Sequence, residues 1–149
     1  MRIEDEIKQK KFKSEYQKLA LNLIFTNGWL GFYQKKFFDN YGITGTQYNI
    51  LRILRGQHPE PVSVNTLRER MLDKMSDTSR LVERLRLKKL LIRNICKNDR
   101  RKSDIYITEE GLQVLKELDS IDDEFEKIFN SLTLDEAKTL NNLLDKMRG

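Results

Sequence analysis

Two arginines one helical turn apart are the residues of this sequence best suited to binding chemistry. Arg80 and Arg84 lie in the segment 76–87, whose apolar residues repeat at helical spacing and predict one buried face. At about 100° per residue, both arginines fall on the opposite, polar face, together with Ser76 and Ser79. A guanidinium group can donate two hydrogen bonds to a guanine edge or to a phosphate. The segment is therefore a candidate for binding nucleic acid.

The positive charge of the chain is concentrated in and just after this segment. From Arg80 to Lys102, ten basic residues against two acidic ones give a formal charge of +8, whereas the whole chain carries +5. A basic helix face followed by a basic loop is typical of a surface that binds duplex DNA, with the helix in a groove and the loop on the backbone. The alternative is a charged face that contacts only solvent, and it explains so local a concentration less well.

A helix-turn-helix pattern would position the basic helix. Ser63 is predicted to cap a short helix and Ser76 to cap the basic one, because a serine hydroxyl can accept from a free backbone N–H one turn further on. Residues 73–75 would then form a three-residue turn, which is helix-turn-helix spacing. Val62 could be a very short strand in front of the first helix.

Two β-rich runs, 91–97 and 103–107, follow the basic helix and predict a hairpin with a charged tip. Cys96, the one cysteine of the chain, falls in the first run. We expect it to fill space as a small apolar side chain. A redox role is the alternative, although no second cysteine could resolve an oxidised one.

The segment 79–111, SRLVERLRLKKLLIRNICKNDRRKSDIYITEEG, resembles the recognition helix and wing of the MarR (multiple antibiotic resistance regulator) family of winged helix-turn-helix transcription factors. The matching features are Ser-Arg-Leu-Val at 79–82, Asp-Arg-Arg at 99–101, and Ile-Thr at 107–108 followed by Gly111. Lys89 departs from the family, which commonly has glycine before the strand. The resemblance implies a mainly α fold and a homodimer on pseudo-palindromic double-stranded DNA. It also implies a repressor that a small phenolic or aromatic ligand releases.

Nine residues are predicted to contact DNA. Arg80 and Arg84 suit guanine edges in the major groove. At the wing, the resemblance places Arg101 in the minor groove and Asp99 where it holds that arginine. Thr78 falls on the inner side of the helix and is left out. The nine residues are Ser76, Asp77, Ser79, Arg80 and Arg84 in the helix, and Asp99, Arg100, Arg101 and Lys102 at the wing.

An aromatic-rich helix is predicted from about Tyr16 to Phe38, with apolar residues on two sides. One side can pack on its own domain, and the other needs a second subunit or a ligand. Trp29, Phe32 and Tyr33 are candidates for the wall of an aromatic-ligand pocket; ordinary core or dimer packing is the alternative.

We expect residues 1–149 to form a single domain. The sequence predicts dimerisation helices at about 1–40 and 112–149 and a winged helix-turn-helix at about 44–111. Thr44 to Gln47 and Thr133 to Glu136 are capping boxes that start helices, and Thr108 can cap the helix between them.

The sequence favours no enzyme and no cofactor. One cysteine and one histidine cannot supply the usual zinc ligand sets, and neither a phosphate-binding glycine loop nor a dinucleotide fingerprint is present. No apolar run reaches the ~18–20 residues that span a bilayer, and no secretory signal precedes the domain, so we expect a cytoplasmic protein. The rival interpretation is a winged-helix protein-interaction module whose basic face binds an acidic partner.

Overall fold

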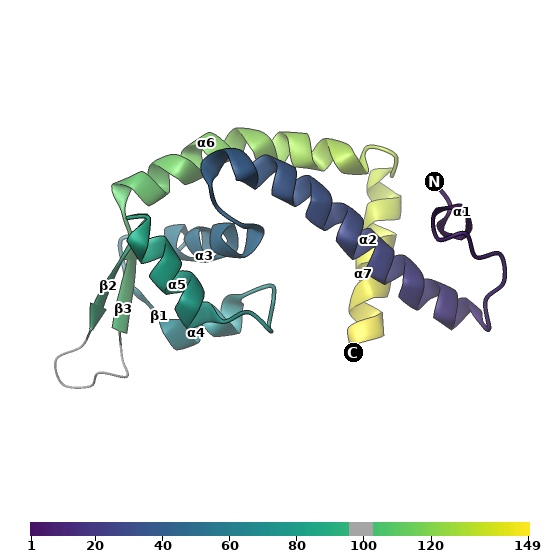
Figure 1. Cartoon of the computed structure of the whole chain (residues 1–149), viewed down its shortest axis with the longest axis horizontal. Coiled ribbons are helices and arrows are strands. Elements are labelled where there is room, and N and C mark those ends of the chain that lie inside the picture. The colour runs from purple at the N-terminus through teal and green to yellow at the C-terminus, as the bar shows by residue number, and fades with distance from the viewer. Residues whose placement is uncertain (96–102) are drawn as a thin grey trace.

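The chain is mainly helical and carries one small sheet, as the computed structural model in Figure 1 shows. Residues 1–95 and 103–149 are described, and of residues 95 and 120–124 only the backbone. The helices are α1 (Ile3–Glu6), α2 (Glu15–Phe38), the 3₁₀ turn η1 (Asp39–Tyr41), α3 (Gly45–Arg55), α4 (Val64–Arg70), α5 (Thr78–Leu87), α6 (Glu109–Glu126), the 3₁₀ turn η2 (Lys127–Phe129) and α7 (Leu134–Arg148). The strands are β1 (Val62–Ser63), β2 (Leu91–Ile95) and β3 (Ser103–Ile107).

A winged helix-turn-helix unit, α3 to β3, occupies one end of the molecule, at the left of Figure 1. From β3, α6 leads away across the top of the view and meets the C-terminal end of α2. The N-terminus, α1 and the first turns of α2 lie at the opposite end. This arrangement separates the basic helix α5 from the terminal helices that the sequence assigns to dimerisation.

Local side-chain hydrogen bonds explain where the helices begin. Thr44 Oγ1 accepts from the backbone N–H of Gln47 at 3.2 Å, and Gln47 Oε1 accepts from that of Thr44 at 3.1 Å. Thr133 and Glu136 form the same reciprocal pair at the start of α7. Each pair satisfies two N–H groups that the helix leaves unbonded. Both predicted capping boxes are confirmed.

The core lies inside the winged-helix unit and extends to the first half of α6. Each of α3, α4, α5, β3 and α6 contributes side chains with at most 1% of their surface exposed, so the unit and this half of α6 form one packed body. These side chains are Ile50, Leu51, Leu54, Leu67, Val82, Leu85, Ile105, Leu115 and Leu118.

The sheet has the order β1-β3-β2, and both pairings are antiparallel. Val62 pairs with Ile105, which confirms the very short strand expected there. Leu91 pairs with Ile107 and Ile95 with Ser103, which confirms the hairpin. The predicted strand residues 96 and 97, including Cys96, lie outside the described residues.

The terminal helices carry apolar side chains that this single chain does not cover. On α2, Tyr16 is 84% exposed, Ile24 70% and Phe32 67%. On α7, Leu134 and Leu143 are also more than half exposed. Within the described residues, none of the helices is long and apolar enough to cross a membrane.

Candidate nucleic-acid interface

The basic helix begins later than the sequence predicts. Asp77, rather than Ser76, is the N-cap of α5, and its Oδ1 accepts from the backbone N–H of Arg80 at 3.1 Å. Ser76 lies instead in the connection before the helix, where its hydroxyl donates to Asp73 Oδ2 at 2.7 Å. Both residue types are good caps, and in the structure it is Asp77 that accepts from the helix.

The connection between α4 and α5 runs over residues 71–77, which corrects the predicted three-residue turn. Leu72 N–H donates to Asn49 Oδ1 of α3 at 2.9 Å and ties the connection to the core. Asp73 accepts from Ser76 Oγ and from the Met75 N–H. Both bonds lower the pKa of its carboxyl group, and the bond from Ser76 has the larger effect. In residues 72–76, hydrogen bonds to the side chains of Asn49 and Asp73 take the place of the backbone bonds of a helix. The connection is therefore longer than expected.

The predicted polar face of α5 is exposed. Ser79, Arg80 and Arg84 all point to solvent, whereas Thr78 is 2% exposed and faces the core, as its position on the wheel predicts. No hydrogen bond or ion pair of the Arg80 and Arg84 guanidinium groups is found among the described residues. Both groups are therefore available to a partner.

A third arginine of α5 is already occupied. Arg86 donates from Nε and Nη2 to the two carboxylate oxygens of Glu83, at 2.9 and 2.7 Å. The bond from Arg86 lowers the pKa of Glu83, and Glu83 raises that of Arg86. The pair neutralises itself, so the free positive charge of α5 is that of Arg80 and Arg84.

A Schellman motif ends α5 and orients the hairpin. Leu90 N–H donates to the Leu85 carbonyl at 3.1 Å and Lys89 N–H to the Arg86 carbonyl at 2.9 Å. This geometry places Lys89 in the left-handed region, with φ at +61°. Glycine adopts that conformation most readily, which gives a physical reason for glycine at this position in the resembled family. The turn forms here with lysine in that place.

Further contacts hold the C-terminal end of α5 against the rest of the unit. Lys88 Nζ donates to the Gly42 carbonyl after η1. Thr108 Oγ1 donates to the Lys89 carbonyl at 2.8 Å and accepts from the Gly111 N–H at 3.1 Å, so the predicted cap of α6 is confirmed. A Cβ on Gly111 would lie 2.3 Å from the Leu90 carbonyl oxygen, so only glycine fits where α6 passes this turn.

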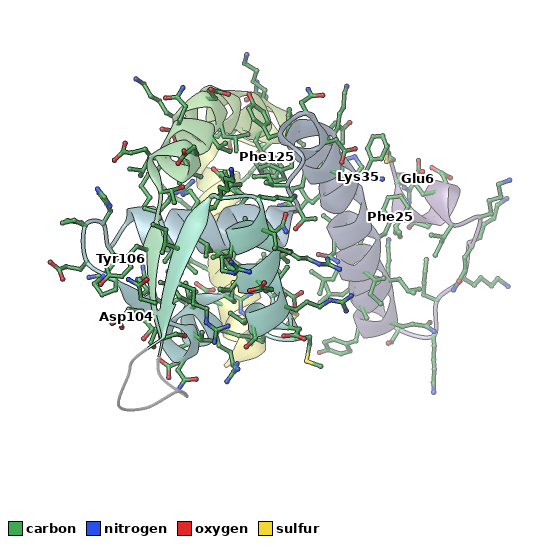
Figure 2. All side chains as sticks on the ribbon, turned by 60° about the vertical axis from the view of Figure 1, so that its left-hand side comes forward. Glu6, Phe25, Lys35, Asp104, Tyr106 and Phe125 are labelled. Atoms are coloured by element: carbon green, nitrogen blue, oxygen red, sulfur yellow. The ribbon has the colours of Figure 1, made fainter. Side chains whose placement is uncertain are left out.

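Strands β2 and β3 lead to the segment predicted to form the wing. Arg93 Nε donates to Ser103 Oγ at 3.1 Å across the two strands. Figure 2 shows Asp104 and Tyr106 along β3, with Asp104 nearer to the wing segment. The four predicted wing residues, Asp99, Arg100, Arg101 and Lys102, lie outside the described residues.

A cavity of about 460 Å³ lies between α2, α3, the end of α4 and α6. Aromatic rings form part of its wall. The rings of Phe38 and Tyr48 are tilted by 34° with 4.7 Å between their centres, and Phe37 contacts Phe125 edge to face at 6.0 Å. Figure 2 shows Phe125 between α6 and α2. The lining residues are Gln34, Phe37, Phe38, Gly45, Tyr48, Asn49, Arg52, Ile53, Arg70, Leu72, Leu118 and Phe125.

The three aromatic residues predicted to form a pocket wall do not line this cavity. Trp29 and Tyr33 contact edge to face at 5.2 Å between ring centres, as do Phe32 and Tyr33 at 5.7 Å. Trp29 and Tyr33 line a separate hollow of about 380 Å³ with Phe37 and residues 127–128. Sequence reasoning missed the larger cavity because its wall joins helices distant in the chain.

No metal-binding site is found in the part of the chain that the structure describes. Among the residues whose side chains the structure describes, three or more histidine, cysteine, aspartate or glutamate side chains that could hold an ion do not come together. What the described site offers is a cationic, exposed helix held at both ends on a packed unit.

Comparison with known proteins finds relatives along most of the chain. A family model described as the MarR family matches residues 41–102. The HTH-type transcriptional regulator MgrA of Staphylococcus aureus is 31% identical over 116 residues, which are 78% of this chain and 77% of MgrA.

Many solved structures share the fold, among them two that match along most of the chain. A mutant MarR from E. coli, complexed with operator DNA, superposes with a TM-score of 0.78 at 20% identity and covers 93% of this chain and 99% of its own. BpsR of Bordetella bronchiseptica superposes with a TM-score of 0.76 at 21% identity, and the match covers 89% of this chain and 99% of the BpsR chain. The structure of BpsR is described as showing how 6-hydroxynicotinic acid regulates its DNA binding.

Proposed function

This chain belongs to the MarR family, and from that premise we propose that it is a transcriptional regulator that binds double-stranded DNA sequence-specifically. The observation that carries the proposal is the exposed face of α5, where Arg80 and Arg84 are unpaired within the described residues while Arg86 is bound to Glu83. The relative MgrA is named a transcriptional regulator, and the MarR neighbour was solved on operator DNA.

In the proposed complex, α5 enters the major groove with its N-terminal half at the base edges. Arg80 and Arg84 donate to guanines, Ser76 and Ser79 contact bases or phosphates near the start of the helix, and Asp77 contacts a base there. The wing residues keep the roles that the resemblance implies. Arg101 enters the minor groove, Asp99 orients it, and Arg100 and Lys102 contact phosphates.

We further propose a homodimer that represses transcription in the cytoplasm. The exposed apolar faces of α2 and α7 supply surface for a second copy, and obligate interfaces usually bury more than about 2,000 Å² in total. A two-fold dimer presents two copies of α5 and so requires a pseudo-palindromic site. Sedimentation at low micromolar concentration should find no stable monomer.

A small aromatic effector with an anionic or phenolic group is proposed for the cavity between α2, α3 and α6. Its aromatic wall suits a ring, and Arg52 and Arg70 among its lining residues suit an anion. Asn49 and Leu72 also line it and are hydrogen-bonded to each other, so a ligand would touch the connection that leads to α5. The BpsR neighbour, regulated by an aromatic acid, supports this ligand class. Trp29, Phe32 and Tyr33 remain the alternative wall.

An arginine pair on α5 tests the DNA-binding proposal. Arg80→Ala should cost about 1–3 kcal/mol on the selected duplex and much less on scrambled duplex, because a base contact is lost. Arg86→Ala removes the same charge, but its guanidinium is already held by Glu83. It should weaken binding to both duplexes by the same factor, because it leaves the Glu83 charge unpaired, and it should leave the ratio of the two affinities unchanged.

Equal losses for the two variants on both duplexes would contradict the proposal. They would mean that α5 acts only as a positive surface. Binding that is indifferent to duplex sequence and that other polyanions compete away equally would favour the module that binds an acidic partner.

A further inference from the structure

Asp77 is an acid with an unused oxygen on the face of α5 proposed to bind DNA. Its Oδ1 accepts from the Arg80 N–H at 3.1 Å as the helix cap. The side chain is exposed, and no hydrogen bond or ion pair of Oδ2 is found within the described residues. Asp77, Arg80 and Arg84 have the spacing i, i+3, i+7, which places them along one side of the helix.

The other acids of this region have both carboxylate oxygens engaged. Asp73 accepts from Met75 N–H with Oδ1 and from Ser76 Oγ with Oδ2, within the connection before α5. Glu83 accepts from Arg86 with both oxygens. Among the acids of residues 71–88, Asp77 is thus the one with a carboxylate oxygen that accepts no hydrogen bond from the described residues.

A carboxylate on a DNA-binding surface interacts very differently with phosphates and with the amino groups of bases. Against a phosphate it is repelled, since both carry negative charge and neither can donate. In the major groove it can accept from an amino group, and the cytosine N4 amino group is the usual partner of aspartate and glutamate. Adenine offers its amino group beside the N7 acceptor, which a second carboxylate oxygen does not complement.

On the basis of the DNA binding proposed above, we propose that Asp77 is a specificity-determining residue whose Oδ2 accepts from a cytosine N4 amino group. Its neighbour one turn on, Arg80, donates to guanine O6 and N7. The acid and the arginine together supply the acceptor and the donors that C·G pairs require. Each half-site therefore contains a cytosine that is read from the start of α5.

Parallel selection of random duplexes by the wild type, Asp77→Asn and Asp73→Asn tests this role. Asparagine caps a helix as well as aspartate does, so α5 should keep its start, which circular dichroism and the melting temperature check. Asparagine also pairs with adenine N6 and N7. The Asp77→Asn variant should lose the cytosine preference at one position of each half-site, by about fivefold or more, and gain adenine there.

Asp73→Asn is the matched control. It removes the same charge four residues earlier, and the asparagine can keep both bonds of the connection, because its oxygen accepts from the Met75 N–H and its NH2 group donates to Ser76 Oγ. It should select the wild-type site.

The outcomes separate this inference from the function on which it rests. If the wild type selects a symmetric site and Asp77→Asn keeps every base preference of that site, the inference is wrong. The inference is equally wrong if both variants shift the same base preference. If the wild type selects no sequence, the proposed DNA-binding function itself fails.

Discussion

Replacing Lys89 by glycine should stabilise the protein. The Schellman motif after α5 forces Lys89 to a φ of +61°, where a residue with a Cβ costs about 1–2 kcal/mol. Glycine removes that cost but loses about 0.5–1 kcal/mol through the greater freedom of the unfolded chain. The difference spans about 0–1.5 kcal/mol with a middle value of about 0.75 kcal/mol, which corresponds to a rise of about 2–3 °C in the melting temperature of a protein of this size.

Thermal and urea unfolding of Lys89→Gly, with Lys89→Ala as control, measure this gain. Alanine removes the same charge and side chain but keeps the Cβ, so it should not be more stable than the wild type. The carbonyl contacts of the turn are made by the backbone and remain in both variants. A glycine variant no more stable than the alanine variant would refute the proposed strain at this turn.

Three other substitutions probe the packing and the charges. Gly111→Ala should cost about 2–3 kcal/mol in urea unfolding, because its Cβ would lie 2.3 Å from a backbone carbonyl oxygen of the turn after α5. Thr78→Val should raise stability by about 1 kcal/mol, because the buried Thr78 Oγ1 has no hydrogen-bond partner among the described residues; a lower melting temperature would contradict this. The hydrogen bond from Lys18 holds the pKa of Glu4 at about 2 instead of 4.5. The stabilising effect of this pair is therefore complete above about pH 4.5 and is lost as the pH falls toward 2. Trp29 fluorescence, which senses the contact of α1 with α2, should shift over that range in the wild type and not in Glu4→Gln.

Features that depend on a few neighbouring residues could be predicted from the sequence. The capping boxes at Thr44 and Thr133 each need only two side chains three residues apart, and both form. The polar face of α5 follows from the helical period alone, so the exposure of Arg80 and Arg84 and the burial of Thr78 could be foreseen.

The start of α5 could not be predicted in the same way. Ser76 and Asp77 are both good N-caps, and the sequence does not tell which of them accepts from the helix; in the structure the Ser76 hydroxyl is bonded to Asp73 within the connection and Asp77 is the cap. The cavity is still harder to predict from the sequence, because its wall consists of residues from separate helices, among them Phe37 of α2, Tyr48 of α3 and Phe125 of α6. No local pattern in the sequence encodes that approach.

The central claim is that two copies of α5 recognise a symmetric DNA site, and a footprint on selected duplex tests it most directly. Duplexes enriched from a random library by the wild-type protein are probed at physiological salt, and the mass of the complex is measured. We predict two protected half-sites related by a dyad, about 10 base pairs or a multiple of that apart, bound by two chains. Enrichment of no common sequence, with binding that heparin competes away as readily as DNA does, would contradict the claim.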